Sequence, residues 1–107
     1  MKQLLLTLAL LSGAAHAEFK DGNKLLSDMT GSHGTQMLAL GYVMGVADAL
    51  NGATHCMPTN VSAGQLHDMT KKYLEDNPVV RHFSADAVIH RMLANLWPCD
   101  KKKGNTL

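Results

Sequence analysis

The sequence lacks the short motifs that usually mark an enzyme. It contains no GxSxG, HExxH or P-loop pattern and no CxxC pair. Nor does it show a cysteine and histidine arrangement typical of a thiol nucleophile. We therefore interpret the chain as a binding protein rather than a catalyst, and we expect it to hold no cofactor.

The histidines offer one alternative to this interpretation, a metal site. His82, Asp86 and His90 would lie on one face of a helix, at a spacing that suits metal ligands, if that helix began before His82. Ser84 is a residue type that favours a helix N-cap, and it separates His82 from the residues that follow. We therefore predict no metal site.

Long apolar runs are also missing, apart from one near the start. Lys2 precedes a leucine-rich run over residues 4–11, and Ala15-His16-Ala17 supplies the small residues that a signal peptidase reads. This pattern predicts a cleaved signal peptide over residues 1–17. The run is shorter than the ~20 residues that span a bilayer, so we favour cleavage. An uncleaved N-terminal anchor is the alternative. We expect a periplasmic protein without a membrane segment after cleavage.

Charge of one sign is not in excess. The formal net charge is +1, and three of the basic residues are Lys101, Lys102 and Lys103 near the end of the sequence. Residues 18–100 carry six basic and nine acidic side chains. A mildly acidic domain is not expected to bind nucleic acid. We predict one folded domain over residues 18–100, followed by a basic, flexible tail over residues 101–107.

Only two cysteines are present, Cys56 and Cys99. In an exported chain such a pair predicts a disulfide. The bridge would close a long loop, and loop entropy then gives a stabilisation of about 4 kcal/mol. Metal ligation by the two thiols is less favoured, because they lie far apart in the sequence.

Apolar residues recur at helical spacing in four segments, and no window alternates as a strand does. We predict helices from about Asn23 to Met29, from Thr35 to Leu50, from a Ser62 cap to Asp76 and from a Ser84 cap to Leu96. The predicted fold class is all-α, a compact four-helix domain with one disulfide. The positions expected to face inward include Leu25, Leu40, Val43, Met44, Ala47, Leu66, Met69, Tyr73, Ala85, Val88, Ile89, Met92, Leu93 and Leu96.

The second predicted helix carries an unusual stripe. Gly41, Gly45 and Asp48 share one of its faces. Each glycine inside a helix costs about 1 kcal/mol relative to alanine, so a close packing partner is expected there. The partner would be another helix of the same monomer, or else a second copy of the chain or a different protein.

The ordered set of residues also resembles the Rap/Tai family of immunity proteins. The resemblance covers residues 19–99 and rests on Gly41-Tyr42-Val43-Met44-Gly45-Val46-Ala47-Asp48-Ala49, Cys56-Met57-Pro58, Val61-Ser62, Gln65-Leu66, Tyr73-Leu74, Asn77-Pro78, Arg81 and Leu96-Trp97-Pro98-Cys99. It implies a periplasmic helical protein that binds a peptidoglycan amidase effector of type VI secretion and occludes its active site. It also implies that the protein could act as a homodimer.

Two exposed segments are candidates for the contact with a partner. The first is the loop that Cys56 would anchor, and the second is the turn around Asn77-Pro78. The candidate residues are His55, Met57, Pro58, Thr59, Asn60, Asn77, Arg81 and His82. The alternative function is a periplasmic acid-stress chaperone, or a periplasmic binding protein of another kind. Seven methionines in the sequence and the histidines favour that alternative, because methionine suits adaptable surfaces and histidine titrates near pH 6.

Overall fold

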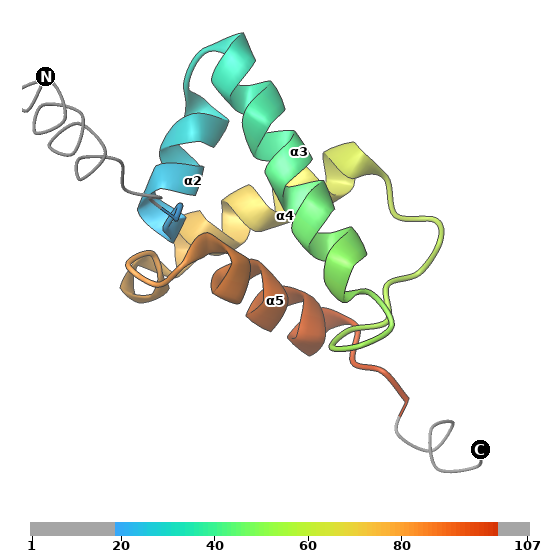
Figure 1. The fold of residues 1–107 in the computed structure, drawn as a ribbon. Helices are drawn as coiled ribbons and strands as arrows, with labels where there is room; N and C mark the ends of the chain where they lie inside the picture. Colours follow the sequence, from blue (N-terminus) through green and yellow to red (C-terminus); the bar gives the residue numbers. More distant parts are fainter. Residues whose placement is uncertain (1–18, 101–107) are drawn as a thin grey trace, which may run out of the picture.

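Four α-helices make up the described part of the chain. The structure, a computed structural model, describes residues 19–100, so the predicted signal peptide and basic tail lie outside it. The helices are α2 (Gly22–Thr30), α3 (His33–Leu50), α4 (Ala63–Asp76) and α5 (Ala85–Leu96), and a short 3-10 helix, η1 (Pro78–Val80), joins α4 to α5 (Figure 1). No strand occurs over residues 19–100, which confirms the predicted all-α class. None of the helices described is long and apolar enough to cross a membrane.

Side-chain caps fix where α3 and α4 begin. The Ser32 hydroxyl accepts a hydrogen bond from the main-chain N–H of Thr35, so α3 starts at His33, two residues earlier than predicted. The predicted capping box of α4 is confirmed: Ser62 accepts from the Gln65 main chain, and the Gln65 side chain accepts from the Ser62 main chain. Both helices therefore begin where a side chain satisfies main-chain donors that lack an intrahelical partner.

The helix ends follow from main-chain conformation. α3 ends at Leu50, and Gly52 adopts φ +88°, a left-handed conformation that glycine reaches without strain. The structure differs from the predicted side-chain cap at Ser84. Ser84 does precede α5, but its side chain makes no capping hydrogen bond. The main-chain N–H of Ala85 instead donates to the carbonyl oxygen of Lys20 at 2.8 Å, which ties the start of α5 to the segment before α2.

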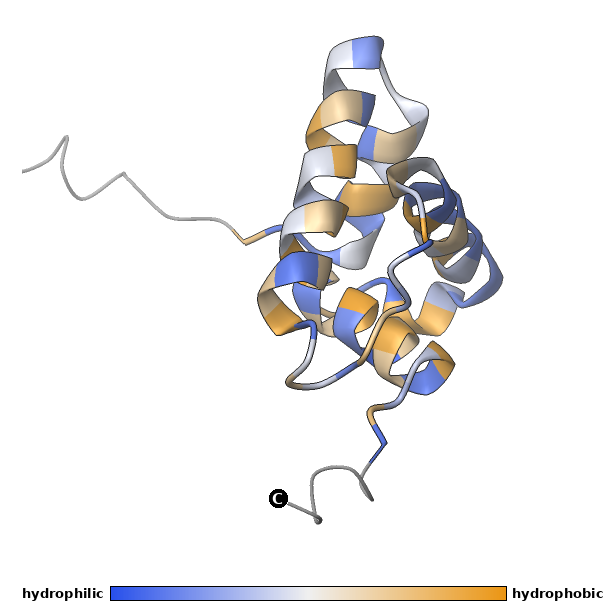
Figure 2. Cartoon of the chain, turned by 90° about the vertical axis from the view of Figure 1, so that its right-hand side faces the viewer, coloured by the Kyte–Doolittle hydropathy of each residue, from blue (hydrophilic) through white to orange (hydrophobic). Residues whose placement is uncertain are grey.

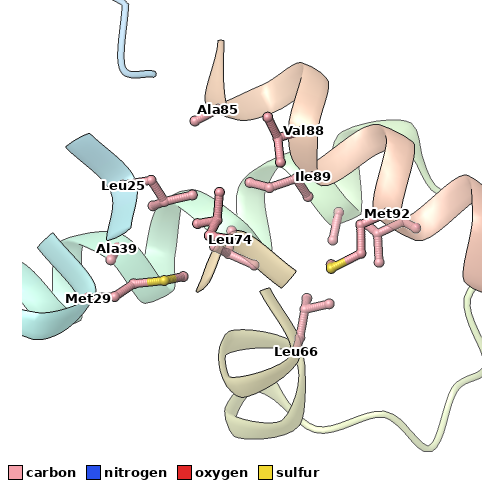
Figure 3. Packing of buried hydrophobic residues seen from close by; sticks show 12 residues of the cluster. Leu25, Met29, Ala39, Leu66, Leu74, Ala85, Val88, Ile89 and Met92 are labelled. Carbon is pink, nitrogen blue, oxygen red and sulfur yellow. The ribbon is translucent and has the colours of Figure 1, made fainter. Parts of the chain in front are cut away.

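The hydrophobic core lies where the four helices meet. Figure 3 shows side chains from α2, α3, α4 and α5 converging on this point. Its buried members are Leu25, Met29, Ala39, Val43, Ala47, Leu66, Leu74, Ala85, Val88, Ile89, Met92 and Leu93. The contribution of α3 is small in volume, because its buried residues are alanine and valine. Small side chains allow the other helices to pack closely against it.

Five positions predicted to face the core are only partly covered. Leu96 is 48% exposed, and Leu40, Met44, Met69 and Tyr73 are intermediate between buried and exposed. Helical periodicity selects the correct side of α4 and α5. The two helices leave part of that side without a covering element, so apolar surface remains open there.

The N-terminal end of α2 packs against the turn that follows η1. The main-chain N–H groups of Gly22 and Asn23 donate to the carbonyl oxygens of Phe83 and Arg81, at 3.0 and 2.9 Å. A Cβ atom at Gly22 would lie 2.9 Å from the Cα of Arg81, so this approach requires glycine. The first helix is thereby attached to the last connection of the chain.

Candidate binding surface

The loop between α3 and α4 is attached to the end of α5. The predicted disulfide is confirmed, and it joins Cys56 to Cys99 with a Cα–Cα distance of 4.8 Å. The main-chain N–H of Cys56 also donates to the carbonyl oxygen of Trp97 at 2.8 Å. Figure 1 shows the loop running beside the C-terminal end of α5. A covalent bond and a hydrogen bond thus fix the same point of the loop.

Further hydrogen bonds shape the loop from within. The main-chain N–H of Gly52 donates to the carbonyl oxygen of His55 at 2.7 Å, and that of Met57 donates to the side-chain oxygen of Asn51 at 2.9 Å. The next three residues, Pro58–Asn60, are exposed. We call Pro58–Asn60 the loop tip. It projects from a base whose conformation is held by these contacts.

His55 corrects one of the partner-contact predictions. Its side chain is fully buried, so it lies beneath the loop surface and cannot touch a partner from this position. Its Nδ1 lies 3.5 Å from the Thr54 hydroxyl, whereas its Nε2 has no hydrogen-bond partner within the described residues. Met57 is partly buried and packs against the core. The accessible part of the predicted loop site is therefore the loop tip.

The second predicted segment is the turn that contains η1. The Asn77 side chain donates to the carbonyl oxygen of Tyr73 at 2.8 Å and so closes the end of α4. Arg81 is partly buried, and its Nε has no hydrogen-bond partner within residues 19–100. His82 is exposed and lies against the ring of Phe83, with 4.2 Å between the ring centroids. His82 is the most accessible of the three predicted contact residues.

The structure does not bring the two candidate segments together. The loop tip follows the disulfide at the C-terminal end of α5, and the η1 turn precedes the N-terminal end of the same helix (Figure 1). α5 has 12 residues, which corresponds to a length of about 18 Å. A partner that covers both segments would have to extend along α5.

The glycine stripe of α3 faces away from the other helices. Within residues 19–100, no atom lies within 4 Å of a Cβ placed at Gly41 or Gly45, and Asp48 is exposed. Of the predicted alternatives, a crossing with another helix is therefore wrong for the helices that the structure describes, and a second copy or another protein remains. Met37 and Leu38 are also exposed on α3, and Figure 2 shows few hydrophilic residues along much of this helix. The exposed side of α3 is thus weakly polar and partly formed by glycine.

Two lysines hold the one buried acidic side chain among the described residues, Asp28. Lys20 and Lys24 both contact the buried carboxylate of Asp28, at 2.7 and 3.1 Å. The hydrogen bond from Lys20 is the largest influence that holds the pKa of Asp28 below its usual value, although burial acts in the opposite direction.

Residues 19–100 contain no group of three or more histidine, cysteine or acidic side chains that could hold a metal. His82 lies outside α5, which begins at Ala85.

A comparison with known proteins supplies the family. The comparison with curated proteins gave no match. A sequence model of the Rap1a immunity proteins matches residues 21–99, which include all four helices and both cysteines. The chain belongs to the family of Rap1a immunity proteins.

Proposed function

We propose that this protein is exported to the periplasm, where it binds a peptidoglycan amidase effector of a type VI secretion system and occludes its active site. Membership of an immunity protein family implies a cognate effector as the partner. The sequence pattern of residues 1–17 supports export. The amidase as target follows from the resemblance of the chain to the Rap/Tai proteins.

The observation that carries this proposal is the loop tip on its fixed base. Pro58, Thr59 and Asn60 are exposed and uncharged, and the preceding Cys56 is held by both the disulfide and the Trp97 carbonyl oxygen. A loop that is already fixed loses little conformational entropy when a partner binds it. The Thr59 hydroxyl and the Asn60 amide supply hydrogen-bonding groups that suit a polar catalytic cleft. This combination suits a plug inserted into the active site of the effector.

The exposed side of α3 supports a second element of the proposal, a homodimer. Gly41 and Gly45 lack side chains that would keep another helix at a distance. Met37 and Leu38 are 52% and 69% exposed, and they would be covered by a second copy. The exposed side of α3 and the loop tip share no residue, so a dimer through α3 does not require the loop tip.

The test is an inhibition titration. The exported, oxidised protein is mixed with peptidoglycan amidase effectors from the same genome or from competing strains. Binding is measured by calorimetry, and residual peptidoglycan cleavage is measured in parallel. We expect stoichiometric inhibition by the wild type and at least a tenfold loss of affinity in Asn60→Arg, because a bulky charge at the tip would not fit the cleft.

The matched control is Ser27→Arg. It places the same charge at an exposed position of α2, away from the loop. We expect it to inhibit as the wild type does. If Asn60→Arg also inhibits fully, the loop tip is not the plug. If the wild type inhibits none of the amidases, the proposed target is wrong.

A further inference from the structure

The structure leaves an apolar groove open between α4 and α5. Two adjoining cavities of about 190 and 360 Å³ share Tyr73 as a lining residue. We call them together the α4–α5 groove. The smaller cavity is lined by Tyr73, Val80, Phe83, Ala87, Val88 and Arg91, from α4, η1, the following turn and α5. The larger one continues along α4 and α5 to Met69 and Leu96.

The groove is lined by apolar residues that helical periodicity had predicted to be in the core. Met69, Tyr73 and Leu96 all line it, and each lies on the apolar side of its helix. Phe83 also lines it and is 50% exposed. Water therefore contacts a continuous set of large apolar side chains, which is a recognised mark of a surface for a partner.

One positive charge beside this groove has no ion-pair partner among the described residues. In the larger cavity, the ammonium group of Lys72 lies 3.0 Å from the carboxylate of Asp76, so these two charges offset each other. Arg91 lines the smaller cavity, and the described residues provide no ion pair for it. The residues four positions before and after Arg91 are Ala87 and Asn95, so its own helix supplies no acid there.

We infer that the α4–α5 groove binds a protein segment in which an apolar side chain stands next to a carboxylate. The apolar side chain would fill the smaller cavity, against Val80 and Phe83. The carboxylate would pair with the guanidinium of Arg91, whose planar geometry suits two parallel hydrogen bonds. The smaller cavity, of about 190 Å³, has room for a single apolar side chain. The inference goes beyond the proposed function, because the groove and the loop tip share no residue.

A pair of small probes tests whether the groove recognises this chemistry. N-acetyl-L-phenylalanine carries an aromatic side chain and a carboxylate, whereas N-acetyl-L-phenylalaninamide differs from it only in lacking the charge. Each is titrated at pH 7 into the isotope-labelled, exported protein, and amide resonances are followed by NMR. We expect shifts at Val80, Phe83, Ala87 and Arg91, and an affinity about fivefold higher for the carboxylate, as for a good exposed ion pair.

Two variants separate the charge from the cavity. Arg91→Gln should abolish the preference for the carboxylate but keep the binding of both probes. Ala87→Leu should weaken both probes, because Ala87 is exposed at the wall of the cavity and leucine would fill it. Ser27→Leu is the matched control on α2 and should bind as the wild type does. Thermal unfolding of each variant checks that it is folded.

Three results would overturn the inference. Equal affinities of the two probes for the wild type would show that Arg91 does not pair with the carboxylate. The absence of shifts at the groove, or shifts confined to other surfaces, would remove the site itself. Shifts of the groove resonances with protein concentration, without a probe, would show that a second copy of the chain occupies it instead. None of these results bears on whether the loop tip inhibits an amidase.

Discussion

The main-chain N–H of Cys56 donates a 2.8 Å hydrogen bond to the carbonyl oxygen of Trp97. The bond lies next to the disulfide between Cys56 and Cys99, so two segments separated by 43 positions in the sequence are held at one point. The hydrogen bond fixes the direction of the main chain there. The disulfide limits how far the two segments can separate when the protein unfolds.

Removal of the disulfide should destabilise the domain strongly. For a separation of 43 residues, the double variant Cys56→Ala/Cys99→Ala should lose about 4 kcal/mol of unfolding free energy, because its unfolded chain regains loop entropy. Urea denaturation of the variant and of the oxidised wild type measures the difference. The wild type in a reducing agent should behave like the double variant. A loss below about 1 kcal/mol would contradict the entropic argument.

Two glycines should respond to alanine in opposite directions. In Gly22→Ala the new Cβ would lie 2.9 Å from the Cα and carbonyl oxygen of Arg81 and 3.1 Å from a methyl group of Leu74. We expect a destabilisation of about 1 to 3 kcal/mol, because main-chain atoms must shift. In Gly41→Ala the new Cβ meets no atom of the described residues within 4 Å, so alanine should stabilise the monomer by up to about 1 kcal/mol.

The measurement is urea denaturation of both variants at several protein concentrations. If α3 forms a dimer, Gly41→Ala should weaken the dimer while it stabilises the isolated monomer. Sedimentation equilibrium then reports the first effect and denaturation at low concentration reports the second. Gly22→Ala should lower stability at every concentration. A stabilising Gly22→Ala would show that the contact with Arg81 can relax without cost.

Much of the fold was predictable because its signals are local. The capping box of Ser62 and Gln65 fixes the start of α4, and the Asn77-Pro78 pair fixes its end, so the predicted bounds of this helix agree with the structure. The disulfide could be predicted from the even number of cysteines together with the export that the sequence predicts. Each of these features depends on residues within a few positions of one another, or on the only pairing available.

The surface features were not predictable, because they depend on how the helices pack. The periodicity that places Leu96 on an apolar face does not say whether another helix covers it, and no helix within residues 19–100 does. Gly41 and Gly45 suggested a close partner, yet the described helices of the monomer supply none. His55 stands in a loop beside exposed residues, but the contacts of Gly52 and Cys56 turn it inward.

Asp28 should make stability depend on acid pH. Its pKa is held low, first by the hydrogen bond from Lys20 and also by Lys24, so its contribution is fully present above the unfolded value of about 3.9. The contribution is lost as the pH falls through the lower folded value. Asp28→Asn should therefore cost about 1 to 3 kcal/mol at pH 7 and much less near pH 2.

Urea denaturation of Asp28→Asn and of the wild type from pH 7 to pH 2 measures this convergence. The matched control is Asp68→Asn, since the side chain of Asp68 is 84% exposed and, among residues 19–100, its ion-pair partner is His67 alone, at 3.5 Å. We expect it to change stability by less than about 0.5 kcal/mol at either pH. A constant difference between Asp28→Asn and the wild type over the whole range would contradict the role given to the lysines.

The hydroxyl of Tyr42 should lose its proton at a higher pH than that of an exposed tyrosine, because its pKa is raised. Burial is the main cause that raises the pKa of its hydroxyl, and the negative charge of Asp86 adds to it, while a hydrogen bond from the Asp86 main chain acts in the opposite direction. Because the folded pKa lies above the unfolded value of about 10, the contribution of Tyr42 to stability is present below that pH. It is lost as the pH rises through the folded pKa.

Absorbance of tyrosinate during an alkaline titration measures this pKa, and Tyr42→Phe identifies the late component by removing it. Asp86→Asn should lower the pKa of Tyr42 but leave it above about 10, because burial remains. The matched control is Asp48→Asn, which removes an exposed acid from the helix that carries Tyr42. If Asp48→Asn lowers the pKa as much as Asp86→Asn does, the effect reflects the overall charge of the protein. A shift confined to Asp86→Asn would assign it to the contact between α3 and the first turn of α5.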